Sequence, residues 1–244
     1  MRIFDLSLFV FLLSVAPAFA QCRIALALAV DVSRSVDAAD YVIQTEGLAE
    51  ALTDPAVEAA IFGVSGEVAI AVYHWSGRRY QEIVADWRVI DTPETLAALA
   101  ETVRATPRFP APLPTALGEA LLFGLDLFET APRCEKQVLD VAGDGRNNDG
   151  LPPQRIYART NFGDLVVNGL AIGEHESDLT EYYRNEVIRG DSAFVEVAVS
   201  QNDYPRAIRR KLIRELSETV SENKIDIFLP KRVVFLTKVG GIQH

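Results

Sequence analysis

The apolar residues of this chain fall into short continuous runs that are separated by segments of mixed polarity. The run at residues 24–30 is followed by the polar cluster 31–35, which is typical of a parallel strand buried on both faces of a sheet. Ser76-Gly77 forms a tight turn, so the segment after it is expected to return as a half-exposed antiparallel edge strand. Strands are expected at residues 24–30, 67–75, 79–86, 136–142, 165–172 and 193–199.

Between these runs, apolar residues recur at the spacing of amphipathic helices. The segment 37–52 carries Tyr41, Leu48 and Leu52 on one face and is stopped by Asp54-Pro55. Helices are expected at residues 37–52, 56–66 (a short helix with a loop), 93–104, 116–129, 152–161, 178–188 and 204–222. Strands that alternate with helices predict an α/β fold, in which a mostly parallel sheet is covered by helices on both faces.

The first residues have the composition of a secretory signal peptide, expected at residues 1–20. Met1-Arg2 precedes an apolar segment at 6–16 and the small residues of Ala18-Phe19-Ala20, which fit cleavage after Ala20. An uncleaved membrane anchor is the alternative, but this segment is shorter than the roughly 20 apolar residues that span a bilayer. The chain is therefore expected to be exported, periplasmic or secreted, with no transmembrane segment in its mature part.

Charge and length limit the class of protein. The 244 residues carry a formal net charge of −10, which argues against nucleic acid as a partner. A basic run in the last helix is expected on its solvated face because apolar residues recur around it at helical spacing; it consists of Arg206, Arg209, Arg210, Lys211 and Arg214. The length suits one domain, expected at residues 21–222, with residues 223–244 as a tail of unknown structure.

Small oxygen-bearing side chains stand where predicted strands end and helices begin. Asp31, Ser33 and Ser35 follow the first strand at alternate positions, so their oxygens can converge on one point. Thr115 opens a helix and Asp144 ends another buried strand, which places both on the same carboxyl edge of the sheet. Such oxygens suit Mg²⁺. Taken alone, Asp-x-Ser-x-Ser also fits an ordinary helix start whose hydroxyls cap backbone amides; the two later positions favour a metal site.

These five positions resemble the metal ion-dependent adhesion site (MIDAS) of von Willebrand factor type A (VWA) domains. That site combines Asp-x-Ser-x-Ser, a threonine before a helix and an aspartate after the fourth strand. The resemblance covers the mature chain to about Leu216. Within the family, the chain is most similar to exported bacterial VWA-like proteins known only as a domain of unknown function, through LDVAGDG at 139–145, NGLAI at 168–172, YYRNEVI at 182–188 and AIRRKL at 207–212.

The resemblance implies a Rossmann-like, doubly wound sheet of six strands in the order 3-2-1-4-5-6, with one antiparallel edge strand. It also implies that Ser33, Ser35 and Thr115 bind a divalent cation directly, while Asp31, Asp144 or both act through water. Such a cation keeps a coordination position for a carboxylate of a partner. Mg²⁺ is the expected ion, with Mn²⁺ and Ca²⁺ as alternatives. In one respect the chain departs from the family, whose loop before the threonine is usually glycine-rich rather than proline-rich.

The implied topology also brings two cysteines together. In the family, the strands that end at positions matching Asp31 and Asp144 are neighbours. Cys22 lies nine residues before Asp31, and Cys134 lies ten residues before Asp144. Strands about 4.8 Å apart place the two α-carbons within disulfide range. Because an exported protein meets oxidising conditions, a Cys22–Cys134 disulfide is expected, with two free buried thiols as the alternative.

Two other functions, catalysis and Ca²⁺ binding by a loop, are less consistent with the sequence. No enzymatic activity is expected, because His74, His175 and His244 are the histidines of the chain and none stands in a recognisable triad. A Ca²⁺ loop at residues 144–149 lacks the glycine and the final glutamate of an EF-hand, so a polar turn is favoured.

The expected function is an exported, metal-dependent adhesion or interaction module that binds an acidic group on a macromolecular partner. A metal-free structural scaffold and a metal-dependent hydrolase are the alternatives. The sequence leaves open the partner, the metal, the oligomeric state and any open–closed switch.

Overall fold

A computed structural model describes residues 21–108, 113–173 and 178–217 of the chain. The expected signal peptide, the C-terminal tail and His175 lie outside the described residues. The strands are β1 (Cys22–Asp31), β2 (Glu67–Trp75), β3 (Gln81–Ile90), β4 (Cys134–Gly143), β5 (Val166–Ile172) and β6 (Val195–Ala198). The α-helices are α1 (Ala38–Leu52), α2 (Pro55–Phe62), α3 (Pro93–Ala105), α4 (Leu117–Leu127), α5 (Pro153–Tyr157), α6 (Leu179–Tyr182) and α7 (Tyr204–Ser217). None of the helices in these ranges has both the length and the apolar character needed to cross a membrane.

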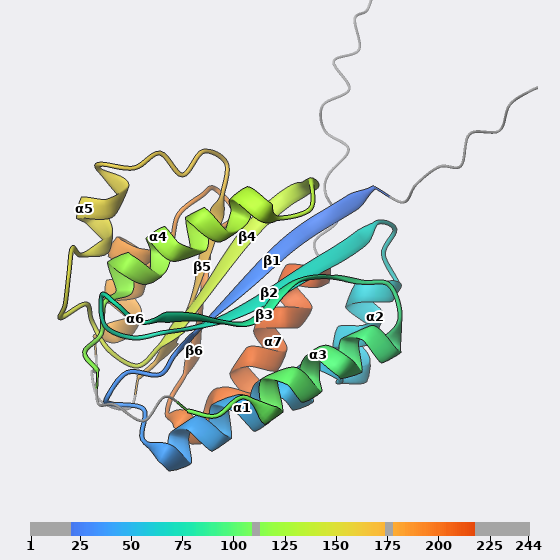
Figure 1. Cartoon of the computed structure of the whole chain (residues 1–244), viewed down its shortest axis with the longest axis horizontal. Helices are drawn as coiled ribbons and strands as arrows, with labels where there is room; N and C mark the ends of the chain where they lie inside the picture. The colour runs from blue at the N-terminus through green and yellow to red at the C-terminus, as the bar shows by residue number, and fades with distance from the viewer. Residues whose placement is uncertain (1–20, 109–112, 174–177, 218–244) are drawn as a thin grey trace, which may run out of the picture.

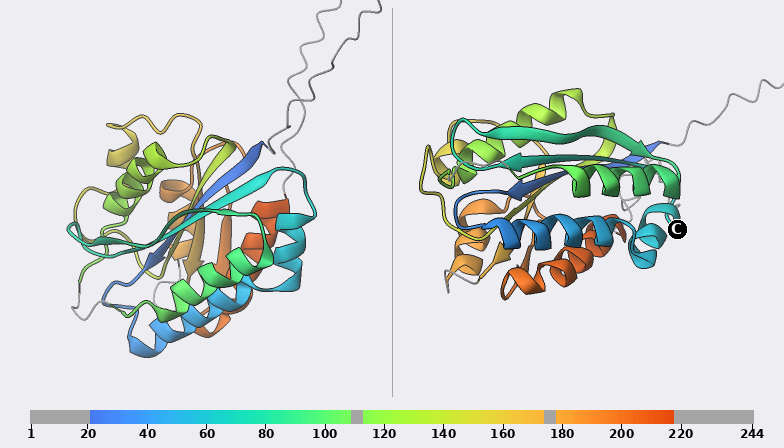
Figure 2. Two further views of the ribbon diagram at one scale, coloured as in Figure 1. Left: turned by 45° about the vertical axis from the view of Figure 1, so that its right-hand side comes forward. Right: turned by 60° about the horizontal axis from the view of Figure 1, so that its bottom comes forward.

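The strands form one sheet in the order β3-β2-β1-β4-β5-β6. Only the β2–β3 pair within it is antiparallel, and the other neighbours run parallel. Helices α1, α2, α3 and α7 cover one face, and α4, α5 and α6 cover the other (Figures 1 and 2). The predicted fold class and strand order are confirmed.

The central strand β1 is buried along its whole length because helices cover both faces of the sheet. Its larger side chains, from Ile24 to Val30 at alternate positions, join the core beneath α1 and α7. The alanines between them face the α4 side, where Tyr73 and Trp75 of β2 fill the space. The apolar cores on the two faces of the sheet hold β1 in place. Its last residue, Asp31, therefore has a fixed position at the carboxyl edge of the sheet.

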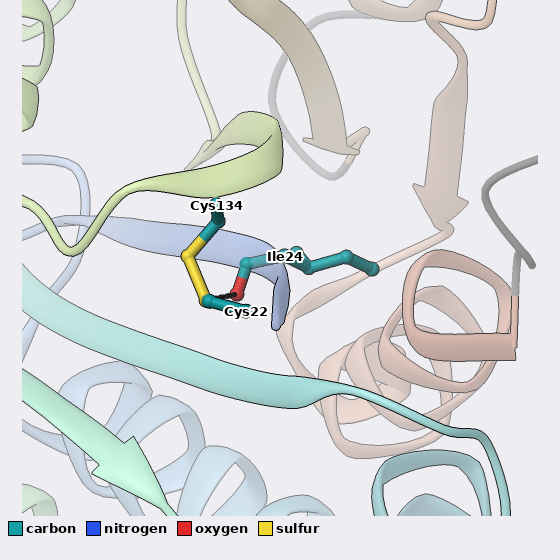
Figure 3. Close-up of a disulfide and its surroundings, with 3 residues drawn as sticks. All are labelled: Cys22, Ile24 and Cys134. Atoms are coloured by element: carbon teal, nitrogen blue, oxygen red, sulfur yellow. Dashed lines mark hydrogen bonds between the residues drawn. A yellow bond between two sulfur atoms is a disulfide. The ribbon is translucent and has the colours of Figure 1, made fainter. Parts of the chain in front are cut away.

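The predicted disulfide is present at the opposite edge. Cys22 and Cys134 stand opposite each other in the parallel pairing of β1 and β4, with α-carbons 4.4 Å apart. Figure 3 shows the bond joining the starts of the two strands. The two most central strands are therefore linked covalently at one end and meet the candidate site at the other.

Some predicted boundaries differ from those observed. Strand β3 extends to Ile90 because its pairing with β2 continues as far as Val68, although its mixed polarity as an edge strand predicts an earlier end. The helix expected at 178–188 is one α-helical turn followed by a π-helix at Tyr183–Val187. The pattern of apolar residues does not distinguish these two helical forms.

The prediction that Lys211 lies on a solvated helix face is wrong. Lys211 is fully buried, and its ammonium lies 2.8 Å from Asp140 and 2.6 Å from Glu215. Asp140 sits in the middle of β4, directly beneath α7, and a buried carboxylate needs a nearby cation. This pairing also explains why an acidic residue is tolerated inside a core strand.

Candidate functional site

The loop that leaves β1 holds its candidate ligands in a fixed turn. The backbone N–H of Ser33 donates to Asp31 Oδ1 at 2.7 Å, and that of Val36 donates to the Ser33 carbonyl at 3.1 Å. Helix α1 is capped by Asp37, whose carboxylate accepts from two backbone N–H groups of the first turn. The serine hydroxyls are therefore not the helix cap. This excludes the alternative that Asp-x-Ser-x-Ser is an ordinary helix start.

Four of the five predicted site residues are joined by short contacts. The Ser33 and Ser35 hydroxyl oxygens are 3.2 Å apart, and the Ser35 hydroxyl donates to Asp144 Oδ1 at 2.6 Å. The backbone N–H of Asp144 also hydrogen-bonds the Asp31 carboxylate. Residues that are 109 positions apart in the sequence thus meet at the end of β1 and β4.

Thr115 lies beside this group, in the loop that leads into α4. Its hydroxyl accepts from the Asn148 side chain at 3.5 Å and, among the described residues, forms no hydrogen bond with the other four. The carbonyl of Leu113, two residues earlier, accepts from the backbone N–H of Arg34 at 2.9 Å. Because Arg34 stands between the two serines, the Thr115 loop is tied directly to the serine loop.

The polar turn after β4 positions this loop. Asn148 Oδ1 accepts from the backbone N–H of Thr115 at 2.8 Å, and Asn147 Oδ1 accepts from that of Gly118 at 3.0 Å. Asp149 Oδ2 accepts from the backbone N–H of Arg78 at 2.9 Å. These oxygens hold neighbouring backbone segments, which supports the polar turn over a Ca²⁺ loop.

Burial creates an electrostatic problem that a cation would relieve. Asp31 is fully buried and Asp144 is 1 % exposed. Burial and, to a smaller extent, the nearby Asp144 carboxylate raise the pKa of Asp31 to about 8. Asp31 Oδ2 has no hydrogen-bond partner among the described residues. Two adjacent carboxylates, an orphan oxygen and two hydroxyls are a donor set that fits a hard divalent cation.

Ser35 is the exposed member of the group, whereas Ser33 and Thr115 are buried. A hydroxyl that donates its proton to a carboxylate still presents a lone pair in another direction. The site therefore opens to solvent on the Ser35 side. Within the described ranges, no group of three or more His, Cys, Asp or Glu side chains is placed to hold a metal, so hydroxyl oxygens would be essential here.

Sequence reasoning missed two residues that line the site from beneath. Gln201 is buried and donates to Asp144 Oδ2 at 3.4 Å. Tyr183 begins the π-helix, and a Cβ on Gly143 would meet its hydroxyl at 2.6 Å and Asp31 Oδ2 at 3.1 Å. Only glycine at 143 lets these groups come so close. Tyr183 lies in a stretch that carries the family resemblance, but nothing local marks Gln201.

Comparisons with known proteins agree with the fold. A family model described as Protein of unknown function (DUF1194) matches residues 21–220. No curated protein sequence matches the chain.

The fold resembles that of several solved structures. One is proximal thread matrix protein 1 (PTMP1) from the mussel byssus with a zinc-occupied MIDAS motif. It is 15% identical to this chain with a TM-score of 0.57, and the match covers 82% of this chain and 49% of PTMP1. A von Willebrand factor type A protein from Catenulispora acidiphila is 17% identical with a TM-score of 0.55, covering 81% and 42%. The pilus adhesin SpaC from Lactobacillus rhamnosus GG is 12% identical with a TM-score of 0.52, covering 80% and 31%. The chain thus has the VWA fold and spans half or less of the length of these proteins.

Proposed function

The chain belongs to the family described as Protein of unknown function (DUF1194), and we propose, from its fold and from the geometry of the site, that it is an exported protein-interaction module that works through a divalent cation. Ser33, Ser35 and Thr115 would supply hydroxyl oxygens to the cation. Asp31 and Asp144 would supply negative charge from beneath, directly or through water. When bound, the cation would offer a coordination position to a carboxylate of the partner.

One observation carries this proposal. The Ser35 hydroxyl donates to Asp144 at 2.6 Å beside the buried, unpartnered oxygen of Asp31, so oxygens from two distant segments gather at one point. In the absence of a cation, burying two neighbouring carboxylates is unfavourable. The turn at Ser33 accounts for Asp31 Oδ1 but leaves Oδ2 buried without a partner, which favours a cation site over a metal-free scaffold.

Proteins with the same fold support a metal-dependent binding function. PTMP1 has a zinc-occupied MIDAS motif on this fold, and SpaC is an adhesin. By analogy with an adhesin on this fold, we propose that the present chain binds a partner and is not an enzyme. The ion is proposed to be Mg²⁺, with Mn²⁺ or Ca²⁺ as alternatives.

Export is part of the proposal. The N-terminal pattern fits a signal peptide at residues 1–20, and the Cys22–Cys134 disulfide is the kind of bond that persists in oxidising compartments. We therefore propose that the protein is periplasmic or secreted, with a single VWA-like domain at residues 21–222 and a tail at residues 223–244.

The direct test is thermal unfolding with and without a divalent cation. A ligand that binds the folded state alone stabilises it by about 2.7 kcal/mol at a hundred times its dissociation constant, which for a domain of this size raises Tm by roughly 5 °C or more. We expect such a rise with millimolar Mg²⁺, its reversal by chelator, and its loss in Asp31→Ala and Asp144→Ala.

The matched control is Asp164→Ala, which removes an exposed carboxylate outside the site and should leave the rise intact. If Mg²⁺, Mn²⁺ and Ca²⁺ all leave Tm unchanged in the unmodified protein, the scaffold alternative is correct. Metal-dependent turnover of a phosphate or carboxyl ester that Asp31→Ala abolishes would support the hydrolase alternative.

A further inference from the structure

A hollow of about 360 Å³ lies beside the proposed metal site. It opens between the turn that joins β2 to β3 and the loop that leads to Thr115. Its lining is mostly apolar and consists of residues 77–80 together with Leu113, Pro114 and Asp149. The metal site itself needs none of these side chains, so the hollow is a separate feature of the same edge.

The walls of the hollow continue directly into the proposed ligands. Pro114 immediately precedes Thr115, and the backbone N–H of Asp149 donates to the Thr115 carbonyl at 3.1 Å. The Leu113 carbonyl accepts from Arg34, the residue between the two serines. The hollow and the proposed ligands therefore share the loop that leads to Thr115, which puts the hollow within reach of residues next to a carboxylate bound at the cation.

Hydrogen bonds between the β2–β3 turn and the Thr115 loop fix the shape of the hollow. The Ser76 hydroxyl donates to the Pro114 carbonyl at 2.9 Å, and the Ser76 carbonyl accepts from the Ala116 N–H at 2.8 Å. A Cβ on Gly77 would lie 3.1 Å from the Pro114 ring, so the turn and the loop are already in close contact. A preformed apolar hollow costs little ordering when a side chain enters it.

Arginines surround this part of the edge in a protein whose net charge is −10. Arg34, Arg78 and Arg79 are exposed, and Arg108 donates to the carbonyls of the serine loop. Acidic side chains also stand near them: Asp37 caps α1, Asp149 pairs with Arg78 at 3.1 Å, and Glu82 accepts from the Tyr80 hydroxyl at 2.6 Å. Because each of these carboxylates already has a partner, the exposed Arg34 and Arg79 give this edge positive charge that is complementary to an acidic partner.

We propose that the hollow is a second subsite for the partner and binds a large apolar side chain within a few residues of the metal-binding carboxylate. The partner segment is an acidic stretch of another protein, attracted by Arg34, Arg78 and Arg79. This inference rests on the proposed function and adds to it the chemistry of the bound segment: one carboxylate at the cation, one apolar anchor in the hollow and further negative charge around them.

The test uses a phage-displayed library of random 12-residue peptides, selected on the immobilised protein in millimolar Mg²⁺. We expect the enriched peptides to share an Asp or Glu and a large apolar residue close to it. Made synthetically with a fluorescent label, they should bind at least tenfold more weakly when the apolar residue is changed to alanine, which is the effect of losing one buried apolar side chain. The unmodified protein is used throughout this comparison.

Two protein variants test the same subsite from the other side. Leu113→Glu places a charge in the hollow and should weaken the peptides at least tenfold, while Arg79→Glu should weaken them several-fold and most at low salt. Arg133→Glu makes the same charge change at an exposed position beside Cys134, at the far edge, and should have no effect. A Tm equal to that of the unmodified protein shows that each variant is folded.

The outcomes separate the two proposals. Peptides that need Mg²⁺ but ignore Leu113→Glu and their own apolar residue would leave the metal site standing and overturn the subsite. Binding that persists in chelator would overturn the proposed function, and the subsite with it. Failure to enrich any peptide would overturn the subsite, as would Mg²⁺-dependent self-association abolished by Leu113→Glu, which would assign the hollow to a second copy of this chain.

Discussion

Several polar side chains are buried at the carboxyl edge of the sheet, next to the proposed metal site. His74, in β2, is one that the site does not use. It is 1 % exposed and lies edge-on to the Tyr41 ring, with 5.6 Å between centroids. Burial lowers its pKa to about 4, although the nearby Glu82 carboxylate acts in the opposite direction. His74 is therefore packed inside the domain, against an aromatic ring.

This histidine should make the protein less stable in mild acid. Below pH 6.5 the unfolded chain binds a proton at His74 that the folded chain does not bind, so the free energy of unfolding falls as the pH drops from about 6.5 to 4. The shift corresponds to a loss on the order of 3 kcal/mol. In His74→Phe, urea unfolding at pH 7 and pH 4.5 should show a smaller difference than in the unmodified protein. Equal differences in the two proteins would contradict the prediction.

At the scale of elements, α7 is held by charge as well as by apolar packing. Ile208, Leu212 and Leu216 pack in the core, as their spacing predicts. Lys211 lies on the same buried face and contacts Asp140 of β4 and Glu215 of α7 itself. Burial, with Glu215 nearby, raises the pKa of Asp140 to about 7. A cation between two buried acids therefore fixes the helix against the centre of the sheet.

Removing that cation should be costly. Lys211→Met preserves the length of the side chain but leaves two buried acids without a partner, and breaking a buried pair in this way costs about 3 kcal/mol or more. Arg206→Met removes a charge from the exposed face of the same helix and should change stability by less than about 0.5 kcal/mol. Urea unfolding at pH 7 measures both. A Lys211→Met protein as stable as Arg206→Met would show that the ion pairs do not hold the helix.

At the scale of the whole molecule, one disulfide joins the two central strands across a sequence separation of 112 residues. These strands come from opposite halves of the chain, and their pairing brings Asp31 and Asp144 to the same edge. A bond that closes so long a loop restricts the unfolded chain strongly. The disulfide therefore stabilises the same strand pairing on which the candidate site depends.

Loss of the disulfide should lower the free energy of unfolding by about 5 kcal/mol, the value that loop-closure entropy gives for a loop on the order of 100 residues. The Cys22→Ala/Cys134→Ala variant should unfold at lower urea than the unmodified protein, and reductant should have no effect on it. In the unmodified protein, reductant should produce a similar loss. Equal urea midpoints for variant and oxidised protein would contradict this expectation.

The sequence was enough to predict most of the helices and strands and five candidate ligands at one edge of the sheet. Continuous apolar runs predict buried strands, and apolar spacing together with caps such as Asp37 predicts helices. These patterns can be read from the sequence because they depend on neighbours close in the chain. The motif beginning at Asp31, together with Thr115 and Asp144, pointed to one edge because parallel strands end on the same side of a sheet. The resemblance to VWA domains supplied the strand order, and with it the disulfide.

Which buried polar groups meet across the packed elements was decided only by the tertiary structure. Nothing near Lys211 in the sequence distinguishes it from its exposed basic neighbours, because its partner Asp140 comes from a strand 71 positions earlier and is brought beneath it only by packing. The same holds for the contact of Gln201 with Asp144, for the contact of Tyr183 with Gly143, and for a hollow whose walls come from three separate loops. Local patterns identify helices, strands and their apolar faces, whereas the burial and the partner of a polar side chain such as Lys211 are set by the register and packing of whole elements.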